Sequence, residues 1–169
     1  RDSALRMSEE GAAIIDIGGE STRPGADDVA GDDELERVIP IVEAIRDRVD
    51  AVISIDTSKP RVMREAVAAG AELINDVYAL RNEGALETVA GLDAAVCLMH
   101  MQGTPRNMQS NPSYEDVAAE VRDFLAGRVQ ACIDAGVLVD HMAYPMQQHG
   151  MRGAHRVHFY RLMTRHFFE

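Results

Sequence analysis

Polar side chains gather at four points along the chain, each directly after a short apolar run. The four sets are Glu20, Ser21, Thr22 and Arg23; Asp56, Thr57, Ser58 and Lys59; Asn75 and Asp76; and Met99, His100 and Gln102. Carboxylates and amides suit a flat heterocycle that carries several N–H donors, and a Met side chain offers a polarizable surface for a ring. A guanidinium and hydroxyls suit an anionic group. These residue types favour a site that positions one small substrate against another.

Covalent hydrolytic chemistry is disfavoured by the same residues. His100 has no obvious Ser or Cys partner, so no nucleophile, base and orienting group can be assembled. We interpret His100 as a hydrogen-bonded residue at a strand end and Lys59 as a helix-start or surface residue. Cys97 and Cys132 both lie in apolar patterns, and we expect buried, reduced thiols because their spacing fits neither a metal knuckle nor a redox pair.

The apolar runs before these sets predict four buried strands, at about residues 13–17, 51–55, 73–74 and 94–98. Apolar residues at three- and four-residue spacing predict helices after each strand, at about residues 33–49, 60–70, 84–90 and 113–136. Within these helices, Pro40 should kink or divide the first, and Ser113 is the expected N-cap of the last.

Regular alternation of strand and helix predicts an α/β protein with a parallel sheet. Right-handed crossovers then bring the four polar strand ends to one edge of that sheet. Four strand–helix units make half of a (β/α)8 TIM barrel, and a complete barrel takes about 250 residues. The chain therefore either holds about half a barrel and lacks the remainder or forms an open sheet, and in both cases the polar residues lie at the carboxyl-terminal edge.

Composition narrows the class of partner. The chain has 169 residues, 46% hydrophobic content and a formal net charge of −11. This charge argues against nucleic acid or an anionic membrane as the main partner. We find neither an apolar run of membrane-spanning length nor a signal-peptide pattern, and so expect a cytoplasmic protein.

The chain changes character after Val137. Residues 1–137 carry 26 acidic and 13 basic side chains, whereas residues 138–169 carry 2 and 4, together with five of the six His residues. We therefore divide the chain into a partial barrel at 1–137 and an atypical tail at 138–169, which we interpret as frameshifted or rearranged. Because Arg1 lies partway through an apparent helix, we also expect the true start to lie upstream.

Four motifs together resemble one known family. IDIGGESTRPGA, ISIDTSKP, LINDV and CLMHMQGTP occur in this order and at the separations seen in bacterial dihydropteroate synthases, over roughly Met7 to Val137. The resemblance implies a TIM barrel that condenses 6-hydroxymethyl-7,8-dihydropterin diphosphate with 4-aminobenzoate. It further implies 7,8-dihydropteroate and pyrophosphate as products, Mg²⁺ as cofactor, sensitivity of the family to sulfonamides and, commonly, a homodimer.

The resemblance also implies roles for individual residues. Asp56 and Asn75 match the family's pterin-binding pair, and Met99 matches a residue of the pterin pocket. Thr22 and Arg23 match the loop that holds aminobenzoate. For Asp56 and Asn75 the structural alternatives are a helix cap and a backbone partner in a loop. Asp16 and Asp76 are candidates for supporting positions behind the binding residues.

Departures from the family pattern define the alternatives. The family's metal-binding Asn would lie before Arg1, so no metal ligand is assigned to this chain, and residues 138–153 do not match the family's next strand and its Asp. Relative to the family the chain is thus truncated at both ends. The two rival interpretations are an inactive pterin-binding remnant and a related pterin-binding methyltransferase, which would not use aminobenzoate.

Overall fold

The fold alternates strands and helices along the chain. In this computed structural model, residues 1–23 and 27–137 are described. The elements are α1 (Asp2–Glu9), β1 (Ile14–Gly18), α2 (Gly31–Ile45), β2 (Val52–Asp56), α3 (Pro60–Ala69), β3 (Leu73–Asp76), α4 (Ala85–Ala90), β4 (Ala95–Leu98) and α5 (Val117–Asp134). A helix thus follows each of the four strands, which confirms the predicted alternation. Predictions for residues 138–169 lie outside the described residues.

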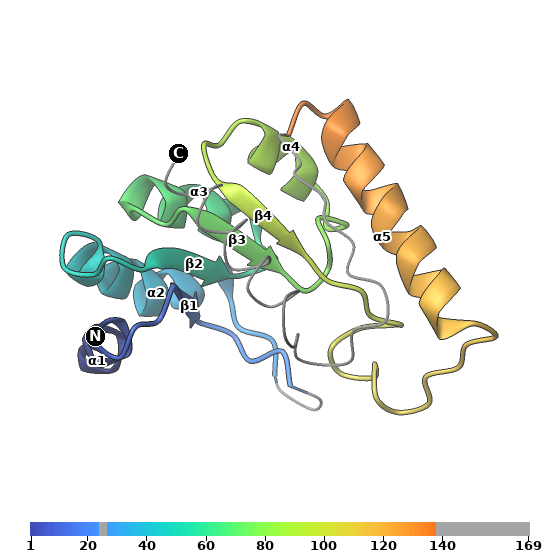
Figure 1. Cartoon of the computed structure of the whole chain (residues 1–169), viewed down its shortest axis with the longest axis horizontal. Coiled ribbons are helices and arrows are strands. Elements are labelled where there is room, and N and C mark those ends of the chain that lie inside the picture. The colour runs from blue at the N-terminus through green and yellow to red at the C-terminus, as the bar shows by residue number, and fades with distance from the viewer. Residues whose placement is uncertain (24–26, 138–169) are drawn as a thin grey trace. The chain divides into compact units, whose positions relative to one another are not determined.

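The four strands form one parallel sheet in the order β1-β2-β3-β4 (Figure 1). In the register of the sheet, Gly18 lies opposite Asp56, Asp56 opposite Asn75, and Asn75 opposite Cys97. Since register partners in a sheet point to the same face, these four residues form one row across the sheet, near the carboxyl ends of the strands. The predicted meeting of the polar strand ends is therefore confirmed.

The other face of the sheet forms the hydrophobic core. Its buried residues include Ile15 and Ile17 of β1, Ile53 and Ile55 of β2, and Ile74 of β3. The helices α2 and α3 supply the opposing side chains, among them Val38, Val42, Val62 and Met63. Full burial of one such side chain contributes about 1.5–3 kcal/mol, so this layer holds the polar strand ends in place.

Of the two effects predicted for Pro40, a kink or a division of its helix, the division was wrong. Helix α2 continues from Gly31 through Pro40 to Ile45. Buried side chains lie on both sides of the proline, with Val38 before it and Val42 and Ile45 after it. Because this apolar stripe packs on the sheet along its whole length, burial outweighs the hydrogen bond that the proline removes.

The N-cap of the last helix was also predicted at the wrong residue. Asp116 caps α5, and its Oδ1 accepts a hydrogen bond from the backbone N–H of Ala119 at 3.0 Å. Ser113 is held elsewhere. Its N–H donates to Gln102 Oε1 at 2.9 Å, and its carbonyl accepts from Gln102 Nε2 at 2.6 Å. Both residue types are good caps, but α5 begins at Val117, so Asp116 stands directly before the helix and Ser113 stands three residues too early.

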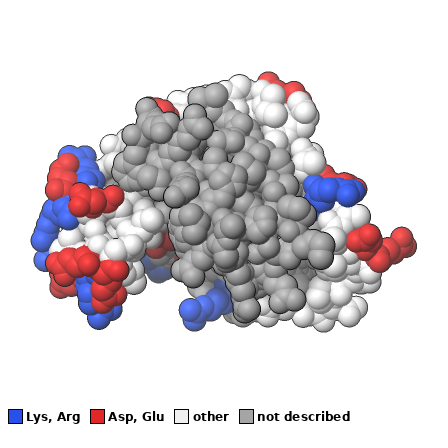
Figure 2. Space-filling model, viewed as in Figure 1, with Lys and Arg blue, Asp and Glu red and all other residues white. Residues whose placement is uncertain are grey.

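Acidic and basic side chains lie next to one another on part of the surface. On the visible part of the face in Figure 2, blue and red side chains adjoin one another on the side where Figure 1 places α1 and α2.

Within residues 1–23 and 27–137, no helix combines the length and the apolar character needed to span a bilayer.

Candidate functional site

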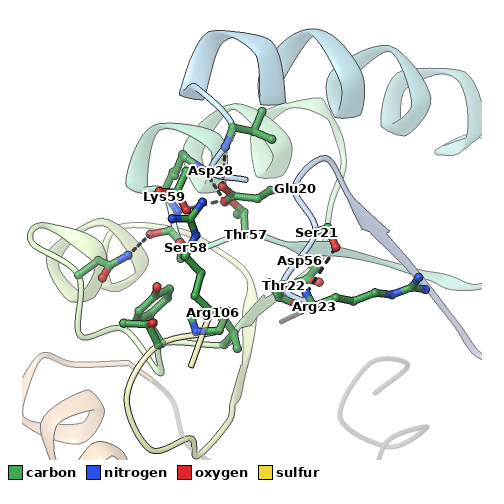
Figure 3. A pocket seen from close by; sticks show the side chains of 16 residues that line it. Glu20, Ser21, Thr22, Arg23, Asp28, Asp56, Thr57, Ser58, Lys59 and Arg106 are labelled. Atoms are coloured by element: carbon green, nitrogen blue, oxygen red, sulfur yellow. Dashed lines mark hydrogen bonds and ion pairs between the residues drawn. The ribbon is translucent and has the colours of Figure 1, made fainter. Parts of the chain in front are cut away.

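A cavity of about 370 Å³ lies at the carboxyl ends of the strands. This volume is within the range of small-molecule sites. Segments that follow all four strands line it, and Figure 3 shows their side chains. The lining residues are Glu20, Ser21, Thr22, Arg23, Asp28 and Val29 after β1; Asp56, Thr57, Ser58 and Lys59 at the end of β2; Val77, Tyr78 and Asn82 after β3; and Thr104, Pro105 and Arg106 after β4.

The structure brings most of the predicted site residues together. Thr22, Arg23 and Asp56 all line the cavity. Asn75 does not line it but lies opposite Asp56 on the neighbouring strand. Met99 follows β4, is 37% exposed and is not among the lining residues. Figure 3 shows the Arg23 side chain extending away from Glu20 and Lys59.

Asp56 has the electrostatic environment of a binding carboxylate. Burial first, and then the nearby carboxylates of Asp16, Asp76, Glu34 and Glu20, together raise its pKa to about 6. Among the described residues, no donor makes a hydrogen bond to its side chain. A carboxylate that is partly desolvated and lacks a partner is a strong acceptor for the N–H groups of a ligand.

Asn75 is oriented by a small polar network. Its Nδ2 donates to Asp16 Oδ2 at 3.2 Å, and the hydroxyl of Ser54 donates to Asp16 Oδ1 at 2.5 Å. The network uses an N–H of the Asn75 side-chain amide. The side-chain oxygen Oδ1 of Asn75 accepts no hydrogen bond in the described part of the chain. Asn75 therefore presents an acceptor next to Asp56, and Asp16 has the supporting position expected of it.

Asp76 has a structural position. Its side chain is fully buried and accepts hydrogen bonds from the backbone N–H groups of Tyr78 at 2.9 Å and Leu80 at 2.8 Å. These bonds hold a turn in which Ala79 and Leu80 have positive φ angles of 52° and 58°. Such angles are costly for residues with a Cβ, so Asp76 stabilises a turn whose neighbours Val77 and Tyr78 line the cavity.

Lys59 lies at the start of α3, which confirms one of our two interpretations, but it is not merely a surface residue. Its Nζ lies 2.6 Å from Glu20 Oε2 and 2.6 Å from Glu34 Oε2. Burial disfavours the charged lysine, but the hydrogen bonds to Glu20 and Glu34 outweigh burial and raise its pKa. One signal could be seen in the sequence, since Lys59 is the only lysine in the chain. The partner Glu34 lies 25 residues away and could not be identified without the fold.

Two further predictions need correction. Cys132 is buried as expected, but Cys97 is exposed, because it lies in the row of Asp56 and Asn75 on the polar face of the sheet. His100 lies just after β4, as predicted, but it makes no hydrogen bond within the described residues; instead its ring centre lies 5.0 Å from that of Phe124 and 5.9 Å from that of Tyr114. Within the described residues, we find no group of three or more His, Cys, Asp or Glu side chains that could hold a metal ion.

Comparison with known proteins is consistent with this geometry. The dihydropteroate synthase of Haemophilus influenzae is 54% identical over 141 residues, which cover 83% of this chain and 51% of that protein. The Escherichia coli enzyme is 53% identical over 131 residues, covering 78% and 46%. The chain therefore spans about half the length of the curated relatives that it matches.

Solved structures agree with the curated relatives. A Yersinia pestis dihydropteroate synthase in complex with a sulfonamide drug superposes with a TM-score of 0.79 at 49% identity, covering 81% of this chain and 50% of that one. The Burkholderia cenocepacia enzyme complexed with 7,8-dihydropteroate gives 0.75 at 55% identity, covering 81% and 49%. The four-stranded sheet is thus part of a TIM-barrel fold, as predicted. The sequence model described as pterin binding enzyme matches residues 1–154, and the chain belongs to this family.

Proposed function

We propose that this chain provides the pterin- and aminobenzoate-binding part of a dihydropteroate synthase. The reaction condenses 6-hydroxymethyl-7,8-dihydropterin diphosphate with 4-aminobenzoate to give 7,8-dihydropteroate and pyrophosphate, in folate biosynthesis. The observation that supports this most strongly is the Asp56 carboxylate, which lines the cavity beside Asn75 and has no donor among the described residues. The Burkholderia cenocepacia relative with bound 7,8-dihydropteroate supports the same ligand class.

In this proposal, Asp56 and Asn75 hold the pterin by accepting hydrogen bonds from its ring N–H groups. A planar ring with adjacent N–H donors suits a carboxylate and an amide carbonyl on neighbouring strands. Met99 offers apolar surface to the ring once it moves inward from its partly exposed position. By holding the pterin ring, Asp56 fixes the orientation of the pterin methylene carbon, which is the carbon that reacts.

Thr22 and Arg23 hold the second substrate. Arg23 is the cation that pairs with the carboxylate of 4-aminobenzoate, and Thr22 contributes a hydroxyl at the same end of the cavity. Because the Arg23 side chain extends away from Glu20 and Lys59 in Figure 3, the proposal requires a rotation of this side chain when the second substrate binds.

The chemistry then follows from orientation. The amine nitrogen of 4-aminobenzoate attacks the pterin methylene carbon, the C–O bond to the diphosphate breaks, and the nitrogen loses a proton. Holding the two reactants together supplies much of the rate gain in such a step. In this chain, the residues named above bind and orient the substrates, and none is assigned as a nucleophile.

Several parts of the proposal concern the surroundings of the site. We include Mg²⁺ in the proposed function as the ion that binds the diphosphate of the pterin substrate, because Mg²⁺ binds phosphates readily while keeping several waters. We assign it no ligand among the described residues, which contain no cluster of three or more His, Cys, Asp or Glu side chains that could hold a metal ion. A cytoplasmic location and a homodimer complete the proposal.

The two rival functions remain distinguishable. A pterin-binding methyltransferase would bind the pterin without using 4-aminobenzoate, and an inactive remnant would form no product. The relatives named above are dihydropteroate synthases, which favours the synthase over the methyltransferase. Product formation separates the synthase from both rivals.

The test is titration calorimetry of the full chain with the pterin diphosphate and Mg²⁺, then with 4-aminobenzoate, followed by an assay for dihydropteroate. We expect Asp56→Ala to weaken pterin binding by about a hundredfold, since it removes a charged acceptor worth about 1.5–3 kcal/mol. Thr22→Ala should weaken aminobenzoate more than pterin. Asp32→Ala, at an exposed position on α2, is the matched control. Equal loss of both ligands in both site variants would contradict these roles.

A further inference from the structure

The connection between β1 and α2 carries the proposed aminobenzoate residues. Its described parts are residues 19–23 and 27–30, and four of the first five and two of the last four line the cavity. These parts belong to no helix or strand, so ladder hydrogen bonds do not fix them. The placement of Thr22 and Arg23 must therefore come from side chains.

Glu20 links the two described parts of this connection, which is also contacted by Arg37, whose guanidinium donates to the Gly19 carbonyl at 2.8 Å, and by Arg106, which pairs with Asp27 at 3.1 Å. Glu20 Oε1 accepts a hydrogen bond from the backbone N–H of Val29 at 2.7 Å, and its Oε2 accepts one from Lys59 Nζ at 2.6 Å. One carboxylate thus joins both described parts of the connection to the start of α3. Burial raises the pKa of Glu20, but the bonds from Lys59 and Val29 outweigh burial and lower it, so Glu20 is charged near neutral pH.

The second carboxylate paired with Lys59 is buried. Glu34 lies in the first turn of α2, is fully buried, and its Oε1 has no hydrogen-bond partner among the described residues. The connection runs directly against this residue, because a Cβ at Gly19 would lie 2.9 Å from Glu34 Cγ and 2.9 Å from Val38 Cγ1. A buried charge requires a partner of opposite sign, and Lys59 is that partner.

We propose that Lys59 is a positioning residue, which ties the connection between β1 and α2 to both helices through Glu20 and Glu34 and thereby sets where Thr22 and Arg23 lie over the cavity. Figure 3 shows Glu20 and Lys59 extending toward each other, with Thr22 and Arg23 further along the same connection. The consequence for aminobenzoate rests on the proposed function, whereas the tether itself does not.

The test separates the tether from the stability of the fold. Lys59→Met alone leaves Glu34 buried and unpaired, which is strongly destabilising, so the double variant Lys59→Met/Glu34→Met is the main probe. Apolar replacement of a buried ion pair is often neutral for stability, yet it leaves Glu20 without its anchor. Arg61→Met is the matched control, since Arg61 also lies in the first turn of α3 and pairs with an acidic residue of α2, Asp32. This pair is exposed and makes no contact with Glu20.

The first measurement is hydrogen exchange of the backbone amides in the full chain. In the double variant, we expect the amides of residues 20–23 and 27–29 to exchange about tenfold faster than in the unsubstituted chain, while the amides of β2 and α3 keep their rates. The Arg61→Met variant should leave all of these rates unchanged. Unchanged exchange of the connection in the double variant would overturn the proposal.

The second measurement is the affinity for each ligand. The double variant should bind 4-aminobenzoate about tenfold more weakly while pterin affinity stays within about threefold, because the side chain of Lys59 bonds to Glu20 and Glu34 and makes no hydrogen bond to the Asp56 and Asn75 acceptors. An equal loss of both ligands, or no loss of aminobenzoate affinity, would overturn the positioning role. If the unsubstituted chain binds neither ligand, the proposed function fails, and the exchange rates alone decide whether Lys59 holds the connection.

Discussion

Asp56 is a residue at which binding and stability oppose each other. The burial and the surrounding carboxylates that make it a good acceptor also make its charged form costly, and its pKa is raised to about 6. A pKa raised above the unfolded value stabilises the folded state below about pH 4 and loses that contribution as the pH rises through about 6. The free protein therefore keeps a destabilising charge at neutral pH.

Asp56→Asn should consequently stabilise the chain at pH 7.5. The expected gain in the free energy of unfolding is about 1–3 kcal/mol, because each pKa unit corresponds to about 1.4 kcal/mol and the site is partly solvated. At pH 4 the gain should disappear, since Asp56 is then protonated in the folded state. Urea unfolding at the two pH values measures it, with Asp32→Asn as the exposed control. A gain that is the same at both pH values would contradict this account of Asp56.

Single residues were predictable where the strand ends fixed their position. Asp56 and Asn75 each follow an apolar run, and parallel pairing alone brings them side by side. Lys59 could not be predicted in the same way, because its environment depends on Glu34, which is buried by the packing of α2. The exposure of Cys97 was missed because an apolar run does not reveal which face of the sheet the helices cover.

At the scale of elements, strands were easier to predict than the start of a helix. Each strand ends where an apolar run meets polar residues, and the structure places all four ends within a residue or two of that point. The start of α5 was ambiguous because Ser113 and Asp116 are both favourable caps. The structure begins α5 at Val117, directly after Asp116, and this starting point decides which residue caps the helix.

This choice of cap can be tested by a matched pair of variants. Asp116→Ala should cost about 1 kcal/mol in the stability of the first turn of α5, because the N–H of Ala119 loses its acceptor. Ser113→Ala should cost little, since Ser113 contacts Gln102 through its backbone, which alanine retains. Hydrogen exchange of the amides of residues 117–120 measures both. A larger effect for Ser113→Ala would reverse the assignment.

At the scale of the whole molecule, the alternation of the sequence predicted about half a barrel, and the chain spans about half of its curated relatives. The sequence could not predict that the helices of this half differ in how many side chains they bury. Helices α2 and α3 each bury several side chains, whereas α5 buries only Cys132 among its residues. Val117 and Ile133 at its two ends are 55% and 51% exposed.

This difference predicts that α5 opens before the rest of the described fold. Its main polar attachment is Arg128, whose guanidinium donates to the carbonyls of Ala79 at 2.7 Å and Leu80 at 3.1 Å. Arg128→Met should lower the opening free energy of α5 by about 1–3 kcal/mol, because it leaves both carbonyls without a donor. Arg122→Met, an exposed arginine on the same helix, is the control.

Native-state hydrogen exchange resolves this order of opening. Amides of α5 should exchange through an opening of lower free energy than amides of β2 and α3, and Arg128→Met should widen that gap without altering β2. The turn at residues 79–80 should loosen together with α5, since Arg128 is the contact that joins them. If α5 and β2 instead exchanged with the same free energy, the described residues would unfold as one cooperative unit, and the sparse packing of α5 would have no energetic consequence.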